Sequence, residues 1–193
     1  HRDLHSFPTR RSSDLGLLIA GSGIKIQDGD LGYLQLRDCT LVPGIDINLD
    51  GTPKNKKQES LVVEGGNAYL NVNIDRCITG SLNLENANCL SVTDSIIDGR
   101  GGSAIDGPSV SISIEESTVL GSVSVRSIKL GSNSIFTGNV TVEREQEGCM
   151  RFCYFPNGST VPQQYNCQPD TEIQRTVKKE FDAALVKNLG MTP

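Results

Sequence analysis

A unit of three short alternating segments recurs between residues 34 and 142 of this chain. Each unit opens with two apolar residues that are spaced by one residue. These opening pairs are Leu34/Leu36, Val72/Ile74, Leu90/Val92, Ile112/Ile114 and Ile128/Leu130. Alternation with a period of two is typical of a strand that buries one face and exposes the other.

The remainder of each unit is also regular. A small or polar residue follows three positions after each opening pair, at Cys39, Cys77, Ser95, Ser117 and Asn133. Two positions later stand Leu41, Thr79, Ile97, Val119 and Ile135, and then Gly44, Gly80, Gly99, Gly121 and Gly138. Gly, Asn, Asp and Ser between the segments favour turns. Three strands per unit with no interior helix predict a coil of parallel strands.

This pattern resembles the right-handed parallel β-helix superfamily typified by pectate lyases and tail-spike proteins, over about residues 16–144. The resemblance implies an all-β fold with three strands per coil and about five to six coils, in which equivalent side chains stack along the interior. Cys39 and Cys77 would then be buried thiols that act as small apolar residues. The main alternative, an antiparallel β-sandwich, predicts no ladder of equivalent residues.

The spacing from Leu34 to Val72 is longer than the others and holds either two coils or one coil with an outward loop. Residues 50–59 are polar, charged and unpatterned, which favours the loop. Leu61 to Val63 would return as a strand.

The two ends of the chain differ from the repeat. Residues 1–15 match the translation of a widely used short-read sequencing adapter and carry both histidines, so we expect a non-native segment outside the fold. The β-helix would then cover residues 16–145. Residues 146–169 are rich in aromatic residues, Pro and Cys, and we expect an irregular cap or excursion there. Residues 170–190 have the apolar spacing of an amphipathic helix, which we expect to lie against the coil or to cover its open end.

Composition narrows the range of partners and cofactors. The net charge is −5 and no basic cluster is present, so nucleic acid is not an expected partner. The apolar runs are too short to span a membrane. Cys149, Cys153 and Cys167 have no histidine near them to complete a zinc site, and we expect no cofactor. A disulfide between Cys167 and one of the other two remains open at this stage.

Two sets of polar residues are weak candidates for a site. Asp94, Asp98, Arg100 and Asp106 are the nearest approach to the carboxylates that cleave polysaccharides. Trp is absent and no histidine lies beyond residue 15, so ordinary turn positions are the preferred interpretation. Asp46, Asn48 and Asp50 match the first half of a calcium-binding EF-hand loop, but Lys57 stands where the bidentate Glu belongs.

These observations favour a non-catalytic structural or interaction module, a fragment of a larger bacterial or phage-tail-like protein. Its partners would be other parts of that polypeptide or assembly. The alternative is a β-helix that binds or cleaves polysaccharide as a lyase or glycoside hydrolase, with a glycan as its ligand. The sequence predicts no cellular location.

Overall fold

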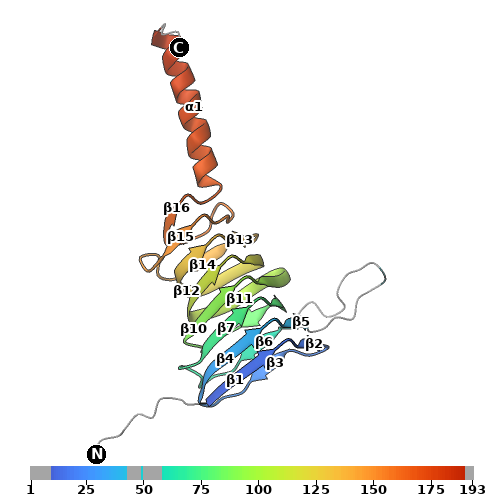
Figure 1. The fold of residues 1–193 in the computed structure, drawn as a ribbon. Helices are drawn as coiled ribbons and strands as arrows, with labels where there is room; N and C mark the ends of the chain where they lie inside the picture. Colours follow the sequence, from blue (N-terminus) through green and yellow to red (C-terminus); the bar gives the residue numbers. More distant parts are fainter. Residues whose placement is uncertain (1–9, 43–48, 50–57, 190–193) are drawn as a thin grey trace, which may run out of the picture.

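The protein is a parallel β-helix of about six turns followed by a single helix, which confirms the predicted fold class (Figure 1). The structure is a computed structural model, and it describes residues 10–42, 49 and 58–189. Each coil has three faces, and every strand pair is parallel.

Face one is the longest stack of strands. In order it contains β1 (Arg10–Leu15), β4 (Leu31–Arg37), β7 (Asn71–Asp75), β10 (Cys89–Thr93), the last part of β11 (Ile96–Glu115), the last part of β12 (Thr118–Ser132), β15 (Cys149–Arg151) and β16 (Gln163–Tyr165). The long strands β11 and β12 run around the corners of the coil and contribute to all three faces, because β11 pairs in turn with β8, β9 and β10.

Faces two and three complete each coil. Face two contains β2 (Leu18–Ala20), β5 (Thr40–Val42), β8 (Ile78–Gly80), the first parts of β11 and β12, and β13 (Ile135–Phe136). Face three contains β3 (Ile24–Ile26), β6 (Leu61–Val63), β9 (Leu82–Asn83), the middle parts of β11 and β12, and β14 (Val140–Val142).

The long step between the first two repeat units is a single coil. Leu34 pairs directly with Val72, so no further strand of face one lies between them. Leu61–Val63 returns as β6, as predicted.

The interior is a continuous apolar column, with one correction to the predicted register. Leu36, Ile74, Val92 and Ile114 are in register and fully buried. The predicted fifth member, Leu130, is wrong, because Lys129 is an extra residue and Ile114 pairs with Gly131 instead.

Gly131 leaves space in the interior column that the Met150 side chain of the next coil fills. A Cβ atom on Gly131 would lie 2.3 Å from the Sδ atom of Met150. Met150 is fully buried and continues the column in place of a branched residue of β12.

The extra residue moves two other predicted positions by one. Ser134, not Asn133, occupies the small-residue position and is buried. Phe136, not Ile135, points inward and is fully buried, and Ile135 is therefore on the outer surface.

The small residues form a ladder inside one corner of the coil. We refer to these buried side chains as the Ser/Cys ladder: Cys39, Cys77, Ser95, Ser117, Ser134, Cys153 and Cys167. Each hydroxyl or thiol donates to the backbone carbonyl two residues earlier, as Ser95 Oγ does to Thr93 at 2.6 Å. Four of the five predicted ladder positions are confirmed.

The ladder also connects the coils. The amide of Cys39 donates to Cys77 Sγ at 3.4 Å, and the amide of Cys77 donates to Ser95 Oγ at 2.9 Å. The amides of Ser95 and Ser117 donate in the same way to the next hydroxyl, at 3.1 and 3.2 Å. These bonds satisfy backbone donors that the corner removes from the regular sheet.

The residue before each rung turns the chain with a positive φ of 50–55°. These corner residues are Asp38, Arg76, Asp94, Glu116, Asn133, Phe152 and Asn166. Left-handed backbone is uncommon for residues other than glycine, and its recurrence at one corner shows that the surrounding hydrogen bonds impose it.

Both ends of the coil differ from the expected boundaries. Arg10–Leu15, expected outside the fold, form β1 and pair with β4, since backbone pairing at an open sheet edge needs no particular side chains. The expected cap at residues 146–169 contains β15 and β16, which continue face one.

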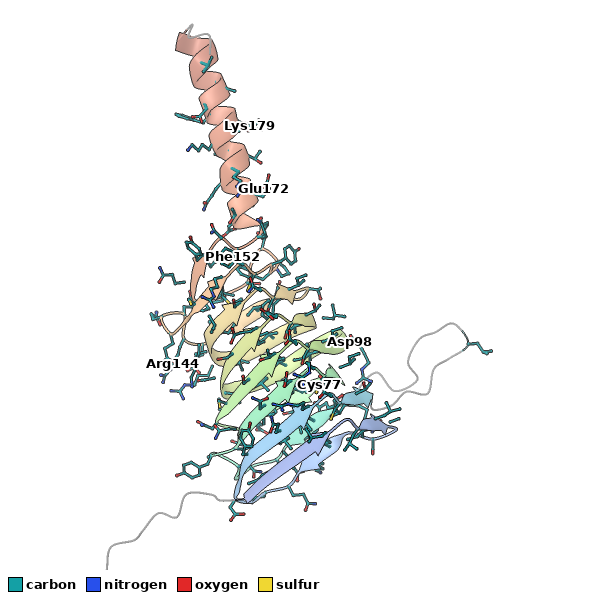
Figure 2. All side chains as sticks on the ribbon, viewed as in Figure 1. Cys77, Asp98, Arg144, Phe152, Glu172 and Lys179 are labelled. Atoms are coloured by element: carbon teal, nitrogen blue, oxygen red, sulfur yellow. The ribbon has the colours of Figure 1, made fainter. Side chains whose placement is uncertain are left out.

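The C-terminal helix α1 (Asp170–Leu189) extends away from the coil, so the expectation that it packs against the coil or covers its end is wrong (Figures 1 and 2). Ile173, Val177 and Phe181 are 49%, 59% and 64% exposed. The helix begins directly after Pro169 and continues beyond the last coil, where no strand of this chain lies opposite its apolar side chains.

Candidate functional site

The carboxylates predicted as catalytic candidates are spread around the coil. Asp94 is an exposed corner residue before face two, Asp98 lies near the end of the face-two segment of β11, and Asp106 is on the outside of face three. Three residues lie between Asp94 and Asp98, and Asp94 turns the chain from face one to face two, so the two carboxylates belong to different parts of the coil surface. Acid-base cleavage of a glycosidic bond needs two carboxyl groups within about 5 to 10 Å.

Of the four candidate residues, Asp98 and Arg100 are the two that contact each other. The backbone amide of Arg100 donates to Asp98 Oδ1 at 2.8 Å, and the Arg100 guanidinium donates to the carbonyl of Gln58 in the preceding coil. These contacts tie the turn after β11's face-two segment to its neighbour.

The calcium candidates Asp46, Asn48 and Asp50 lie outside the described residues. Among the residues that the structure describes, no group of three His, Cys, Asp or Glu side chains could hold a metal ion.

The six cysteines are free thiols, including Cys149, Cys153 and Cys167. Burial raises the pKa of Cys153 to about 11. Burial also raises the pKa values of Cys77 and Cys89. Because the thiolate is the reactive form, these thiols are poor nucleophiles at neutral pH.

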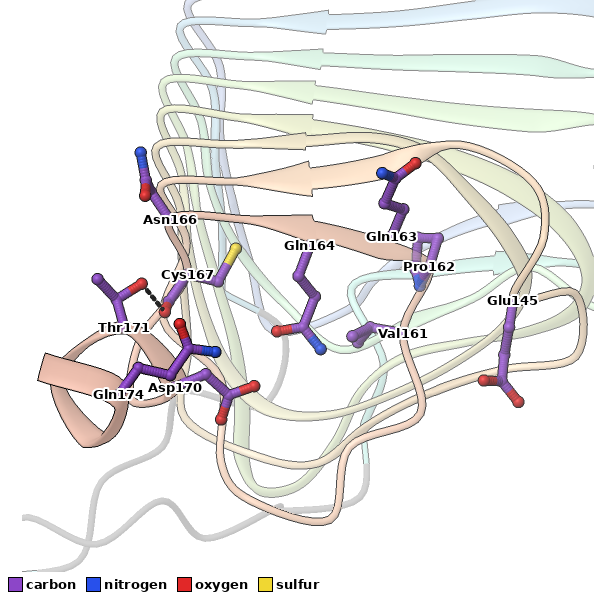
Figure 3. Close-up of a pocket in the computed structure, with 10 residues that line it drawn as sticks. All are labelled: Glu145, Val161, Pro162, Gln163, Gln164, Asn166, Cys167, Asp170, Thr171 and Gln174. Carbon is purple, nitrogen blue, oxygen red and sulfur yellow. Dashed lines mark hydrogen bonds between the residues drawn. The ribbon is translucent and has the colours of Figure 1, made fainter. Parts of the chain in front are cut away.

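A polar hollow of about 480 Å³ lies at the C-terminal end of the coil (Figure 3). Its lining includes Gln163, Gln164, Asp170 and Gln174. Gln164 continues the interior column after Met150, and its side chain is exposed. The hollow is therefore the uncovered end of the coil, where polar side chains replace the apolar interior.

An exposed column of mainly apolar side chains runs along the outside of face two. We refer to this column as the apolar stripe: Leu18, Thr40, Ile78, Ile96, Thr118, Ile135 and Tyr154. Consecutive members pair in register, so they stack at the spacing of neighbouring strands, about 4.8 Å.

The stripe is exposed although most of its side chains are large and apolar. Leu18, Ile78, Ile96, Ile135 and Tyr154 are between 41% and 73% exposed. Single exposed apolar residues are normal on a protein surface, whereas a continuous row of them is a candidate interaction surface.

The outer columns of the other two faces are mainly polar. A column on face one contains Gln35, Asn73, Ser91 and Ser113. A column on face three contains Asn83, Asp106, Ser124 and Thr141. The apolar surface therefore belongs to one face of the coil rather than to strands in general.

Exposed aromatic side chains lie at the C-terminal end of the stripe. The rings of Phe152 and Tyr165 are 5.7 Å apart and meet edge to face. Tyr154 is two residues from Phe152, so the stripe ends beside an aromatic pair. The sequence-based interpretation as a packed cap holds for buried Phe155 but not for these three exposed residues.

The apolar stripe was not predicted from the sequence, although its positions follow from the repeat. Ile78, Ile96, Thr118 and Ile135 each follow a Ser/Cys ladder residue directly, and strand alternation then places them outside. The pattern that defined the inward residues contained this information.

Comparisons with protein families, with curated proteins and with solved structures find no match to this chain. No helix in the described part of the chain is both long enough and apolar enough to cross a membrane.

Proposed function

We propose that this β-helix is a non-catalytic structural and interaction module of a larger bacterial or phage-tail-like assembly. The observation that carries the proposal is the apolar stripe, which offers a straight row of side chains for contact with another protein. Protein contacts are stabilised by burying such surfaces, whereas an isolated coil gains nothing from exposing them.

The arrangement of polar groups also supports a non-catalytic role over polysaccharide cleavage. Asp94 and Asp106 lie on different parts of the coil, and Asp98 is engaged by the backbone of Arg100. An acid and a base that act on one glycosidic bond must face the same substrate atom.

A carbohydrate assay tests this proposal against its alternative. The purified chain is incubated with a panel of acidic and neutral polysaccharides, and new reducing ends and unsaturated products are measured. We expect no turnover and no retention on immobilised glycans. Turnover that disappears in both Asp94→Ala and Asp98→Ala, while circular dichroism shows intact strands, would establish the enzyme instead.

A further inference from the structure

Two apolar surfaces of this chain are left without a partner. One is the apolar stripe of face two, and the other is the side of α1 that carries Ile173, Val177 and Phe181. Beyond half-buried Thr171, the described side chains of α1 are all exposed. In proteins most of the stability of a helix comes from packing its amphipathic face, so α1 would gain stability from a partner.

The two surfaces have matching lengths. The 20 residues of α1 span about 30 Å at 1.5 Å per residue. The stripe from Leu18 to Tyr154 contains six steps of about 4.8 Å, or about 29 Å. Ile173, Val177 and Phe181 recur about every 6 Å, close to the spacing of the stripe's side chains.

The two surfaces are also arranged end to end. Gln168 pairs with Tyr154, the last residue of the stripe, and α1 begins two residues later. The helix then continues in the general direction of the coil axis (Figure 1). A second copy that runs in the opposite direction therefore brings its stripe beside this helix, and its own helix beside this stripe.

Charged side chains of both signs border the two surfaces. The acidic corner residues Asp94 and Glu116 precede Ile96 and Thr118 by two positions. Lys178 and Glu180 border the two flanks of the apolar side of the helix. In the antiparallel register, Val177 is about 11 Å from the start of α1 and Thr118 is about 10 Å from Tyr154, so Lys178 reaches the level of the acidic corners.

From these features we infer that two copies of this chain associate antiparallel, with α1 of each copy lying along the apolar stripe of the other. The contact forms twice around one two-fold axis, as in a closed symmetric dimer. This inference rests on the proposed function, since it identifies a second copy as the occupant of the proposed interaction surface.

Analytical ultracentrifugation of the full chain at micromolar concentration is the first test. We expect twice the chain mass of 20.8 kDa. Phe181→Glu on the helix and Ile96→Glu on the stripe should each weaken dimerisation at least tenfold. Val186→Glu on the opposite side of α1 and Thr141→Glu on face three are matched controls that should remain dimeric. A monomeric wild type, or a dimer that neither test substitution weakens, would overturn the inference.

A crosslinking experiment identifies the surfaces without relying on destabilising variants. A benzophenone amino acid replaces Phe181 in a mixture of ¹⁴N- and ¹⁵N-labelled chains, and crosslinked peptides are analysed by mass spectrometry. We expect mixed-isotope peptides that join position 181 to the stripe near Ile78 or Ile96. Crosslinks confined to single-isotope pairs would show α1 folded back on its own coil and would refute the dimer.

The two proposals fail separately. Polysaccharide turnover with an intact dimer would remove the non-catalytic role and leave the association standing. A monomer without carbohydrate activity would remove the association and leave the stripe available to a different protein.

Discussion

At the residue scale, seven buried hydroxyls and thiols at one corner hold the turns of the coil together by hydrogen bonds. Each rung donates to the backbone carbonyl two residues earlier, and Cys77, Ser95, Ser117 and Ser134 also accept an amide from the preceding coil, as Ser117 does from Ser95. Ser and Cys both serve because each provides one short side chain with a donor and an acceptor.

Removing one rung is therefore costly. Ser117→Ala leaves the amide of Ser95 without its acceptor, and we expect a loss of roughly 1–3 kcal/mol in the free energy of unfolding. Ser117→Cys should cost less, because cysteine occupies equivalent rungs. Urea unfolding of both variants checks this, with Ser113→Ala on the outer surface as the control. Equal losses for Ala and Cys would show that the ladder bonds do not matter.

Thr79 is an interior position where the natural side chain is not optimal. It lies in register between Leu41 and Ile97, and its Oγ1 has no partner among the described residues. A buried hydroxyl without a hydrogen bond is destabilising. We expect Thr79→Val to stabilise the fold by roughly 1–2 kcal/mol in thermal or urea unfolding. As the control, Thr141→Val on the outer surface should change the free energy of unfolding by less than about 0.5 kcal/mol. A Thr79→Val variant that is less stable than the wild type would show that the Thr79 hydroxyl has a hydrogen-bond partner.

At the scale of elements, paired charges join neighbouring strands at the same corner. Arg76 Nε donates to Asp38 Oδ1 at 2.7 Å, and Arg37 Nε donates to Asp75 Oδ2 at 2.9 Å, so β4 and β7 are linked in both directions. The hydrogen bond from Arg76 lowers the pKa of Asp38.

This lowered pKa predicts how the link depends on pH. A carboxyl whose folded pKa lies below its unfolded pKa contributes stability above the unfolded value, and the contribution is lost as pH falls through the folded value. We expect an NMR titration to place the Asp38 midpoint below the ordinary value of about 3.9. Asp38→Asn should reduce the loss of stability on acidification, whereas Asp106→Asn, which has no ion pair within the described residues, should not. An unshifted Asp38 midpoint would contradict the link.

The elements also show how far the sequence predicts the fold. Alternation and the recurring small residue were sufficient for the parallel coil and for the register from Leu36 to Ile114, because the extra residues between these units lie outside the face-one strands, which pair without a register shift. One extra residue, Lys129, then displaced Leu130, Asn133 and Ile135 by one place. Bulges of this kind depend on contacts with the next coil, here Met150 over Gly131, which local periodicity does not contain.

The candidate site was less predictable than the fold. The acidic residues were chosen for their chemistry, but strand geometry separates Asp94, Asp98 and Asp106. The placement of α1 depends on what lies opposite its apolar side chains, which amphipathic spacing alone does not specify.

At the scale of the whole molecule, each coil contacts only its neighbours, so stability should vary along the axis. Interior coils have two neighbours and terminal coils have one. We expect native-state amide exchange to be slowest in β7, β10 and β11, and faster in β2, β3 and β16. Mass spectrometry of exchanged peptides measures this order, and uniform protection along the coil would show a single cooperative unit instead.

The Ser/Cys ladder gives the molecule a polarity. Each corner donates its amides toward the coil that follows, as Asp38 and Cys39 do toward the next strand, and this direction is the same at successive rungs. After the last corner, at Asn166 and Cys167, the described part of the chain has no further coil to accept such donors, because α1 begins at Asp170. An extended segment with a serine or cysteine at the ladder position could accept hydrogen bonds from this corner and add to the coil as a further strand. Among the described residues, the first coil offers no equivalent row of amide donors, so the two ends of the coil differ in how they can bind an added strand.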